Sequence, residues 1–203
     1  MPATRNIAIV ILAAGESSRM QQPKQLLAWG GTTLLGNAIK VALDSHANDV
    51  YVVLGNRSEM IKKENSTFKV QWIYNRNWKR GMGSSISCAI KHILGSKKER
   101  YKGILITLCD QPLIDSECLN EMIDTLINGD RGIVATAYNN RSGVPVLFHS
   151  KYFEKLSKLD NDLGAKKIIA ANLQDVFAID PKGKEKDLDT TEEYRAALKN
   201  MNF

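Results

Sequence analysis

Near its start the chain reads Ile7-Ala8-Ile9-Val10-Ile11-Leu12-Ala13-Ala14-Gly15-Glu16-Ser17-Ser18-Arg19-Met20. The residues up to Ala14 are apolar, and glycine, serine and arginine follow at once. A continuous apolar run of this kind is typical of a strand that is buried on both faces of a parallel sheet. A secretion signal has a superficially similar apolar segment, but the polar cluster after Ala14 favours a strand followed by a loop in a mature protein.

Strand-like apolar runs recur along the rest of the chain and alternate with stretches of helical periodicity. This alternation predicts an α/β fold, a single-domain Rossmann-like three-layer sandwich with a mostly parallel central sheet. A chain of 203 residues is expected to form one domain, residues 1–203. The expected strands are Ile7–Leu12, Val50–Leu54, Val70–Tyr74, Ile104–Leu108, Gly132–Ala137 and Val144–Phe148, and the clearest helices are Leu34–Leu43, Ser85–Leu94, Cys118–Ile127 and Lys166–Ala171.

Composition narrows the class of protein. Hydrophobic residues make up 43% and charged residues 25%, which disfavours disordered and fibrous chains. No apolar run approaches the roughly 18 residues of a membrane span, so we expect no membrane partner. The net charge of +6 fits a solvated basic surface or a phosphorylated substrate, whereas nucleic acid is not expected because its binding motifs are missing. Cys88, Cys109 and Cys118 form no Cys-x-x-Cys pair and are odd in number, which predicts a reducing, cytoplasmic location.

Ligands of such sheets bind beyond the carboxyl ends of the strands. Three loops at these positions, Ala13–Lys24, Asn75–Ser85 and Cys109–Leu113, are rich in glycine, polar and charged residues. In the first loop, small residues let the backbone approach a ligand, and successive N–H groups can cradle phosphate. Arg19 offers a bidentate fork and Lys24 a point charge. A strand-to-helix turn with exposed basic residues would contain the same residues, so this loop alone leaves both interpretations open.

The longer pattern is more specific. Leu12-Ala13-Ala14-Gly15-Glu16-Ser17-Ser18-Arg19-Met20, with Pro23-Lys24-Gln25-Leu26-Leu27 after it, resembles the MobA-like NTP transferases, a family of molybdenum-cofactor nucleotidyltransferases, and within it the cytidylyltransferase (MocA) type. The likeness covers nearly the whole chain in order, although Gln21, Asn161 and Thr191 replace residues usual in the family. The later matching blocks are Asn75 with Trp78 and Gly81-Met82-Gly83-Ser84-Ser85, Cys109-Asp110-Gln111-Pro112, Gly143–Phe148, Asp162–Lys166 and Asp187–Tyr194.

This resemblance implies a magnesium-dependent enzyme that transfers CMP from CTP to molybdopterin, with a client molybdoenzyme or its chaperone as a possible partner. Ala14 stands where guanylyl-transferring relatives tend to have glycine, which favours the smaller base. The alternatives are a GTP-using guanylyltransferase, or a nucleotidyltransferase for a sugar phosphate or another alcohol phosphate. A non-catalytic nucleotide-binding regulator is disfavoured because Arg19, Lys24, Asp110 and Asp189 are all present.

The resemblance also assigns roles to residues. It makes Arg19, Lys24 and Asp110 catalytic, and it assigns Mg²⁺ to Asp110 and Asp189, with Asp187 beside them. A phosphate monoester acceptor is already mostly dianionic near neutral pH, so the reaction requires no general base. The expected nucleotide-binding residues are Leu12, Ala13, Ala14, Gly15, Arg19, Lys24, Asn75, Gly81, Gly83, Ser84 and Ser85.

Structural interpretations compete with some of these roles. Asp110 follows an apolar strand, where a magnesium ligand would emerge, but it could instead cap the helix expected near Ser116. Asp187 and Asp189 would point the same way in an extended segment, or form a solvated acidic turn before the last helix. Ser84 could be a helix N-cap. Trp72, in the expected strand Val70–Tyr74, and Trp78, in the second loop, are more consistent with packing than with base stacking.

Overall fold

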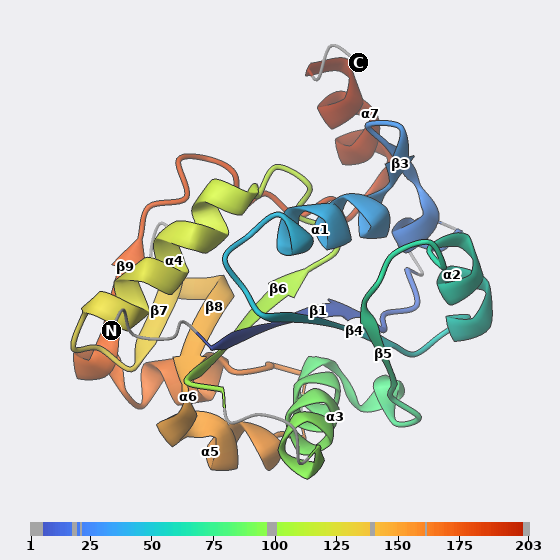
Figure 1. Cartoon of the computed structure of the whole chain (residues 1–203). Coiled ribbons are helices and arrows are strands. Elements are labelled where there is room, and N and C mark those ends of the chain that lie inside the picture. Colours follow the sequence, from blue (N-terminus) through green and yellow to red (C-terminus); the bar gives the residue numbers. More distant parts are fainter. Residues whose placement is uncertain are drawn as a thin grey trace.

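The computed structural model describes residues 6–17, 20, 22–96, 101–138, 141–160 and 162–200. A seven-stranded sheet with the order β5-β4-β1-β6-β8-β7-β9 lies between two layers of helices (Figure 1). All neighbouring strands are parallel except β8, which is antiparallel to β6 and β7. The strands of this sheet are β1 (Ile7–Ala13), β4 (Asp49–Leu54), β5 (Gln71–Tyr74), β6 (Gly103–Leu108), β7 (Ile133–Tyr138), β8 (Arg141–His149) and β9 (Val176–Ile179).

Helices cover both faces of the sheet. In Figure 1, α1 and α4 lie above it and α3, α5 and α6 lie below it. The mostly parallel three-layer arrangement confirms the predicted fold class. The helices are α1 (Leu34–Leu43), α2 (Ser58–Glu64), α3 (Met82–Gly95), α4 (Ser116–Asn128), α5 (Phe153–Ser157), α6 (Lys166–Ala170) and α7 (Thr191–Asn200).

The expected strands and helices are all present, with small shifts at their ends. The periodicity of the sequence did not predict α2, α5, β9 or the small hairpin of β2 (Ala28–Trp29) and β3 (Thr32–Thr33). These elements are short and show at most a weak period in the sequence. Strand β8 begins three positions after β7 ends and pairs with it, and so short a separation in the chain requires the antiparallel direction.

The first strand explains why its sequence is apolar at every position. Ile7, Ile9 and Ile11 pack in one cluster with residues of α1 and α4, whereas Ala8 and Val10 pack in another with residues of α3, α5 and α6. Successive side chains of a strand point to opposite faces, so a strand covered on both sides needs an apolar residue at each position. The central position of β1 carries its carboxyl end to the middle of one sheet edge, and the arrows of β1 and β6 point to the same side in Figure 1.

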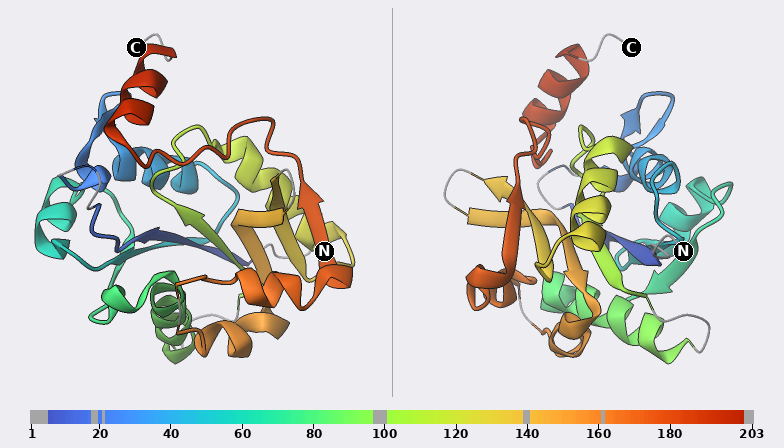
Figure 2. Two further views of the ribbon diagram at one scale, coloured as in Figure 1. Left: turned by 180° about the vertical axis from the view of Figure 1, so that it is seen from behind. Right: turned by 60° about the vertical axis from the view of Figure 1, so that its left-hand side comes forward.

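A third, smaller cluster attaches the end of the chain to the body. Trp29 and Leu188 are buried there, and Leu198 of α7 packs against them. The Tyr194 hydroxyl donates a hydrogen bond of 2.7 Å to the Ala28 carbonyl. Although α7 projects from the body in both views of Figure 2, these contacts hold the segment before it in place. Within the described parts of the chain, no helix is long and apolar enough to cross a bilayer.

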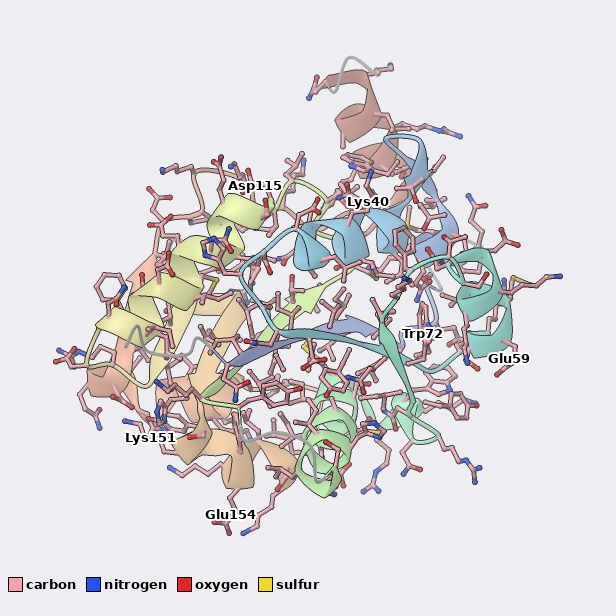
Figure 3. The ribbon with its side chains drawn as sticks, viewed as in Figure 1. Lys40, Glu59, Trp72, Asp115, Lys151 and Glu154 are labelled. Carbon is pink, nitrogen blue, oxygen red and sulfur yellow. The ribbon has the colours of Figure 1, made fainter. Side chains whose placement is uncertain are left out.

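Asp175 clamps the edge strand β9 onto its neighbours. Its Oδ1 accepts a hydrogen bond of 3.0 Å from the Gly132 amide, and its Oδ2 accepts one of 2.5 Å from the Tyr152 hydroxyl. The Lys151 ammonium, labelled in Figure 3, lies 2.8 Å from the same oxygen. Burial alone would raise the pKa of Asp175, but these donors lower it to about 2.

We expect Asp175→Asn to lower the free energy of unfolding by about 1–3 kcal/mol at pH 7, because it weakens three contacts to a carboxylate. A depressed pKa stabilises the fold fully above the unfolded value of about 4, and this contribution disappears as the pH falls through the folded value. The free energies of unfolding of the wild type and Asp175→Asn, measured with urea, should therefore converge as the pH is lowered from 5 toward about 2. The control is Asp130→Asn at an exposed carboxylate, and a difference that does not change with pH would contradict the role of Asp175.

Candidate functional site

The carboxyl ends of β1 and β6 open into a cavity of about 210 Å³, which we call the central cavity. Residues from all three glycine-rich and polar loops line it, so these loops meet as the sequence analysis expected. Gly81 lies in the second of these loops. Its φ of 94° is in the left-handed region, which favours glycine. The lining residues are Leu12, Ala13, Ala14, Gly15, Lys24, Gln25, Trp78, Gly81, Met82, Ser85, Leu108, Cys109 and Asp110.

Gln25 holds the first loop from behind, a role that the sequence analysis did not predict. Its side chain is 1% exposed, and its Nε2 donates hydrogen bonds of 3.0 Å to the carbonyls of Ala13 and Gly15. The Ser17 hydroxyl donates to Gln25 Oε1 at 3.3 Å and accepts from the Lys24 amide at 3.0 Å. The described part of the loop is therefore cross-linked. A buried glutamine looks like an exposed one in the sequence, because glutamine is usually exposed.

Lys24 joins two carboxylates at the mouth of β6. Its Nζ donates to Asp110 Oδ2 and, at 3.2 Å, to Asp189 Oδ1. Burial alone would lower the pKa of Lys24, but the charges of Asp110 and Asp189 raise it above its ordinary value. The ammonium therefore stays charged at neutral pH. The other oxygen of Asp110, Oδ1, is buried and has no hydrogen-bond partner within the described part of the chain.

The position of Asp189 depends on contacts made by the residues around it. The Leu188 amide donates to the Asp110 carbonyl at 2.9 Å, and the Leu188 side chain is 2% exposed. Glu193 accepts hydrogen bonds of 2.9 Å from the amides of Asp189 and Thr190, and its own amide donates to the Thr190 hydroxyl at 3.2 Å. This reciprocal pattern is a capping box at the start of α7. These contacts hold the carboxylate of Asp189, near the end of the chain, beside that of Asp110, which follows β6.

Asp187 lies two residues before Asp189 on the same segment. Loss of hydration, together with the negative charge of Asp110, raises the pKa of Asp187 to about 6. Asp187 lines a second cavity of about 110 Å³, which we call the side cavity. Met82 and Leu108 line both cavities, so the side cavity adjoins the central one. Asp187 therefore lines the side cavity, whereas Asp189 contacts Lys24.

The side cavity combines an apolar wall with a few charged groups. Ile106, Val144 and Leu163 belong to the apolar part, and Arg141 and Lys166 add two cations. Beneath it, the Gln111 amide donates to the Tyr138 hydroxyl at 2.9 Å and to the Glu185 carbonyl at 3.1 Å. The Arg141 guanidinium lies 5.6 Å from the centre of the Tyr138 ring. Such a cavity suits a ligand that has both a ring and an anionic group.

The carboxylates are suited to a hard cation. Among the described residues there is no group of three or more His, Cys, Asp or Glu residues that could hold a metal. Magnesium, however, commonly takes only one or two protein carboxylates and completes its shell with water and substrate phosphates. Asp110 and Asp189 supply such a pair, and the unpartnered Oδ1 of Asp110 is an available oxygen. Burial and the charge of Asp110 raise the pKa of Cys109 to about 12, so this thiol stays protonated and is a poor ligand.

The expected nucleotide-binding residues divide into two groups. Leu12, Ala13, Ala14, Gly15, Lys24, Gly81 and Ser85 line the central cavity, but Asn75, Gly83 and Ser84 do not. The Asn75 Nδ2 donates hydrogen bonds of 3.0 Å to the hydroxyls of Ser84 and Ser85, so it supports the second loop from behind. Arg19 lies outside the described residues, as do Gln21 and Asn161.

The structure decides between several interpretations that the sequence left open. Asp115 is the N-cap of α4 and accepts from the Cys118 amide at 2.9 Å, so Asp110 is not that cap. The N-cap of α3 is Gly81, so the interpretation of Ser84 as an N-cap is wrong. Trp72 and Trp78 both pack against core clusters, which confirms the packing interpretation, and Trp78 also lines the central cavity.

Residues 9–176 match the profile of the family described as the MobA-like NTP transferase domain. The chain is 28% identical over 169 residues to the bifunctional protein GlmU of Buchnera aphidicola subsp. Schizaphis graminum; the match covers 81% of this chain and 35% of that protein. The chain thus spans about a third of the length of the curated relatives it matches.

Two solved structures are similar over almost the full length of both chains. The crystal structure of Rv0371c from Mycobacterium tuberculosis H37Rv has a TM-score of 0.83 and 29% identity, and covers 98% of this chain and 100% of that one. A structure of Rv0371C in complex with manganese, also from Mycobacterium tuberculosis H37Rv, has a TM-score of 0.78 and 27% identity, with 97% and 100% covered.

Proposed function

Because this chain belongs to the MobA-like NTP transferase family, we propose that it is a nucleotidyltransferase of the cytidylyltransferase type. The reaction we propose is transfer of CMP from CTP to molybdopterin with release of pyrophosphate. One observation carries the proposal: Lys24, Asp110 and Asp189 converge beside the small-residue loop that follows β1. A cation and two carboxylates next to a phosphate-sized backbone turn are the groups that phosphoryl transfer needs.

In this proposal the nucleotide occupies the central cavity. Its phosphates approach the backbone of Ala13, Ala14 and Gly15, and Lys24 moves from the carboxylates to the β- and γ-phosphates. The sequence indicates the same target for Arg19. Gln25 keeps the carbonyls of the loop engaged, so that the backbone does not rearrange when the anion binds. The chain therefore aligns the triphosphate and neutralises its charge, while the acceptor phosphate supplies the attacking oxygen.

We assign Mg²⁺ to Asp110 and Asp189. Bound there, the ion would polarise the α-phosphate and neutralise charge on the leaving pyrophosphate. The likeness to a relative whose structure is a complex with manganese supports a divalent cation in this family. The Oδ1 of Asp110 supports it independently, because a buried carboxylate oxygen without a partner is costly unless a ligand satisfies it.

The side cavity is our candidate for the acceptor. Its apolar wall would hold the ring system of molybdopterin, and Arg141 and Lys166 would attract its phosphate. The adjoining positions of the two cavities support an acceptor phosphate directed toward the α-phosphorus. We propose that residues 1–203 act as one domain in the cytoplasm and that a molybdoenzyme or its chaperone receives the product.

The reaction is tested by following pyrophosphate release with each of the four ribonucleoside triphosphates, with and without molybdopterin and Mg²⁺. We expect release to depend on molybdopterin and to be fastest with CTP. Faster release with GTP would identify a guanylyltransferase instead. Release that requires a sugar phosphate or another alcohol phosphate in place of molybdopterin would overturn the acceptor assignment but leave the class of reaction intact.

Base choice is tested at Ala14, which is 6% exposed and lines the central cavity. One methyl group in a pocket discriminates by roughly 1–3 kcal/mol, about 10–200-fold, so we expect a preference for CTP within that range and residual use of GTP. Ala14→Gly should narrow the ratio of kcat/KM values without changing the magnesium requirement. Ala171→Gly, at the end of α6 and outside both cavities, is the matched control. An unchanged ratio in Ala14→Gly would show that the first loop does not select the base.

A further inference from the structure

A third cavity, of about 510 Å³, lies behind the loop that follows β5. We call it the basic cavity, because Arg76, Arg80, Lys91 and Lys158 line it and Asp160 is the one carboxylate among its lining residues. The cations come from separate parts of the chain: the loop after β5, helix α3 and the residues after α5. Basic residues from distant segments thus converge on a hollow larger than the central cavity.

Part of this positive charge is not neutralised by the protein. Arg80 pairs with Asp160, and Lys158 pairs at 2.6 Å with Glu154, which Figure 3 shows on the outer side of α5. Among the residues that the structure describes, neither Arg76 nor Lys91 takes part in an ion pair. A ligand with several negative charges would gain from these two cations and could also engage the fork of Arg80.

The floor of the basic cavity favours a small ligand over a protein or nucleic acid surface. Ser84 and Ser87 lie there and are 8% and 4% exposed, so the hollow is lined with small polar groups below the level of the cations. The Ser87 hydroxyl donates to the Ser157 carbonyl at 2.5 Å, which ties the floor to the end of α5. A macromolecule held by charge needs only an open basic surface, whereas a hollow with a polar floor suits a compact anion.

The basic cavity and the central cavity share one wall. Trp78, Gly81 and Ser85 line the central cavity, whereas Asn77 and Ser84 line the basic one. The Ser84 hydroxyl contacts the carbonyls of Asn77 at 3.0 Å and Gly81 at 2.8 Å, so the wall is internally hydrogen-bonded. A ligand in the basic cavity would therefore contact the Asn75–Ser85 loop on one side, while the other side of this loop faces the central cavity.

We propose that the basic cavity is a second, separate binding site for a small molecule that carries a polyphosphate group. The polyphosphate bridges Arg76 and Arg80 of the loop to Lys91 of α3, and so holds the shared wall in place. This site does not depend on the reaction proposed above, because none of its cations lines the central cavity.

Calorimetric titration with inorganic tripolyphosphate tests the proposal. We expect two sites in the wild-type chain, since Lys24 also attracts phosphates. Arg76→Glu/Lys91→Glu should weaken one of them at least about tenfold, and Lys24→Ala should weaken only the other. The matched control is Lys62→Glu/Lys63→Glu on α2, which changes the net charge equally at exposed lysines away from the basic cavity. Circular dichroism verifies that each variant is folded.

The outcomes separate this site from the proposed reaction. A single site that Arg76→Glu/Lys91→Glu leaves unchanged, or an equal loss in Lys62→Glu/Lys63→Glu, would overturn the basic cavity as a binding site. A loss confined to Arg76→Glu/Lys91→Glu supports it even if Lys24→Ala changes nothing. Repeating the titration with CTP and ATP tests which molecule supplies the polyphosphate group. A nucleotide that binds this site more tightly than tripolyphosphate would be identified as the ligand. Binding of an acidic peptide or an oligonucleotide without binding of any polyphosphate would contradict the proposal.

Discussion

Replacing Asp110 with alanine is expected to leave the fold intact and to lower nucleotidyl transfer by at least about a hundredfold, the scale of losing a major electrostatic contact in the transition state. The fold should persist because Lys24 keeps Asp189 as a partner and because the backbone carbonyl of residue 110 still accepts from Leu188. Removing this carboxylate also relieves its repulsion of Asp187. The loss should therefore appear in turnover rather than in unfolding.

The measurement is kcat for pyrophosphate release across a range of Mg²⁺ concentrations, with binding of Mn²⁺ to the nucleotide-loaded chain followed by electron paramagnetic resonance. Asp110→Asn keeps the size of the side chain and should lose turnover and Mn²⁺ affinity together. Asp130→Ala, at an exposed carboxylate, is the control for the loss of one charge. Near-normal, magnesium-dependent turnover in Asp110→Ala would refute its assignment as a metal ligand.

Lys24→Ala is expected to weaken binding of CTP far more than binding of CMP. A hydrogen bond to a charged group contributes about 1.5–3 kcal/mol, so the loss for the triphosphate should be on the order of ten- to a hundredfold. The reason is that Lys24 is proposed to bind the β- and γ-phosphates, which CMP lacks. The variant also leaves Asp110 and Asp189 facing each other without the ammonium between them, so this pair of carboxylates should attract Mg²⁺ more strongly.

Equilibrium binding of CTP and CMP at fixed Mg²⁺ measures this difference. Lys24→Arg keeps the charge and should recover part of the affinity, whereas Lys40→Ala, on the exposed side of α1 in Figure 3, should change neither ligand. Equal losses for CTP and CMP would contradict the assignment to the outer phosphates. Arg19→Ala is expected to behave as Lys24→Ala does, on the evidence of the sequence.

The order of elements and the position of the site could be predicted because both depend on local patterns. A continuous apolar run such as Ile7 to Ala13 is typical of a strand covered on both faces, and its side chains do alternate between two core clusters. Loops after such strands share one edge of the sheet, so the meeting of Gly15, Gly81 and Asp110 followed from order alone. The antiparallel direction of β8 could not be predicted in this way, because an apolar strand has the same sequence pattern in either direction.

Short elements and supporting contacts could not be predicted. Helices of one or two turns, such as α2 and α5, show at most a weak period, and their stability comes from packing. Gln25, Asn75 and Ser84 support the loops through hydrogen bonds to partners that their own sequence neighbourhood does not identify. Ser84 is the clearest case, because a serine near a helix start favours an N-cap locally. Its buried partners instead place it within the first turn of α3.

The sequence by itself determined the α/β class, the loop of small residues after β1 and the presence of Lys24, Asp110 and Asp189. Each of these is a property of consecutive residues, which periodicity and residue chemistry express directly. Only the tertiary structure decided that Lys24 contacts both carboxylates, since Asp189 reaches Asp110 through the buried Leu188 and the capping box of Glu193. It also decided that four distant cations converge in the basic cavity. Contacts between residues far apart in the chain arise from the packing of whole elements, and no local pattern in the sequence specifies them.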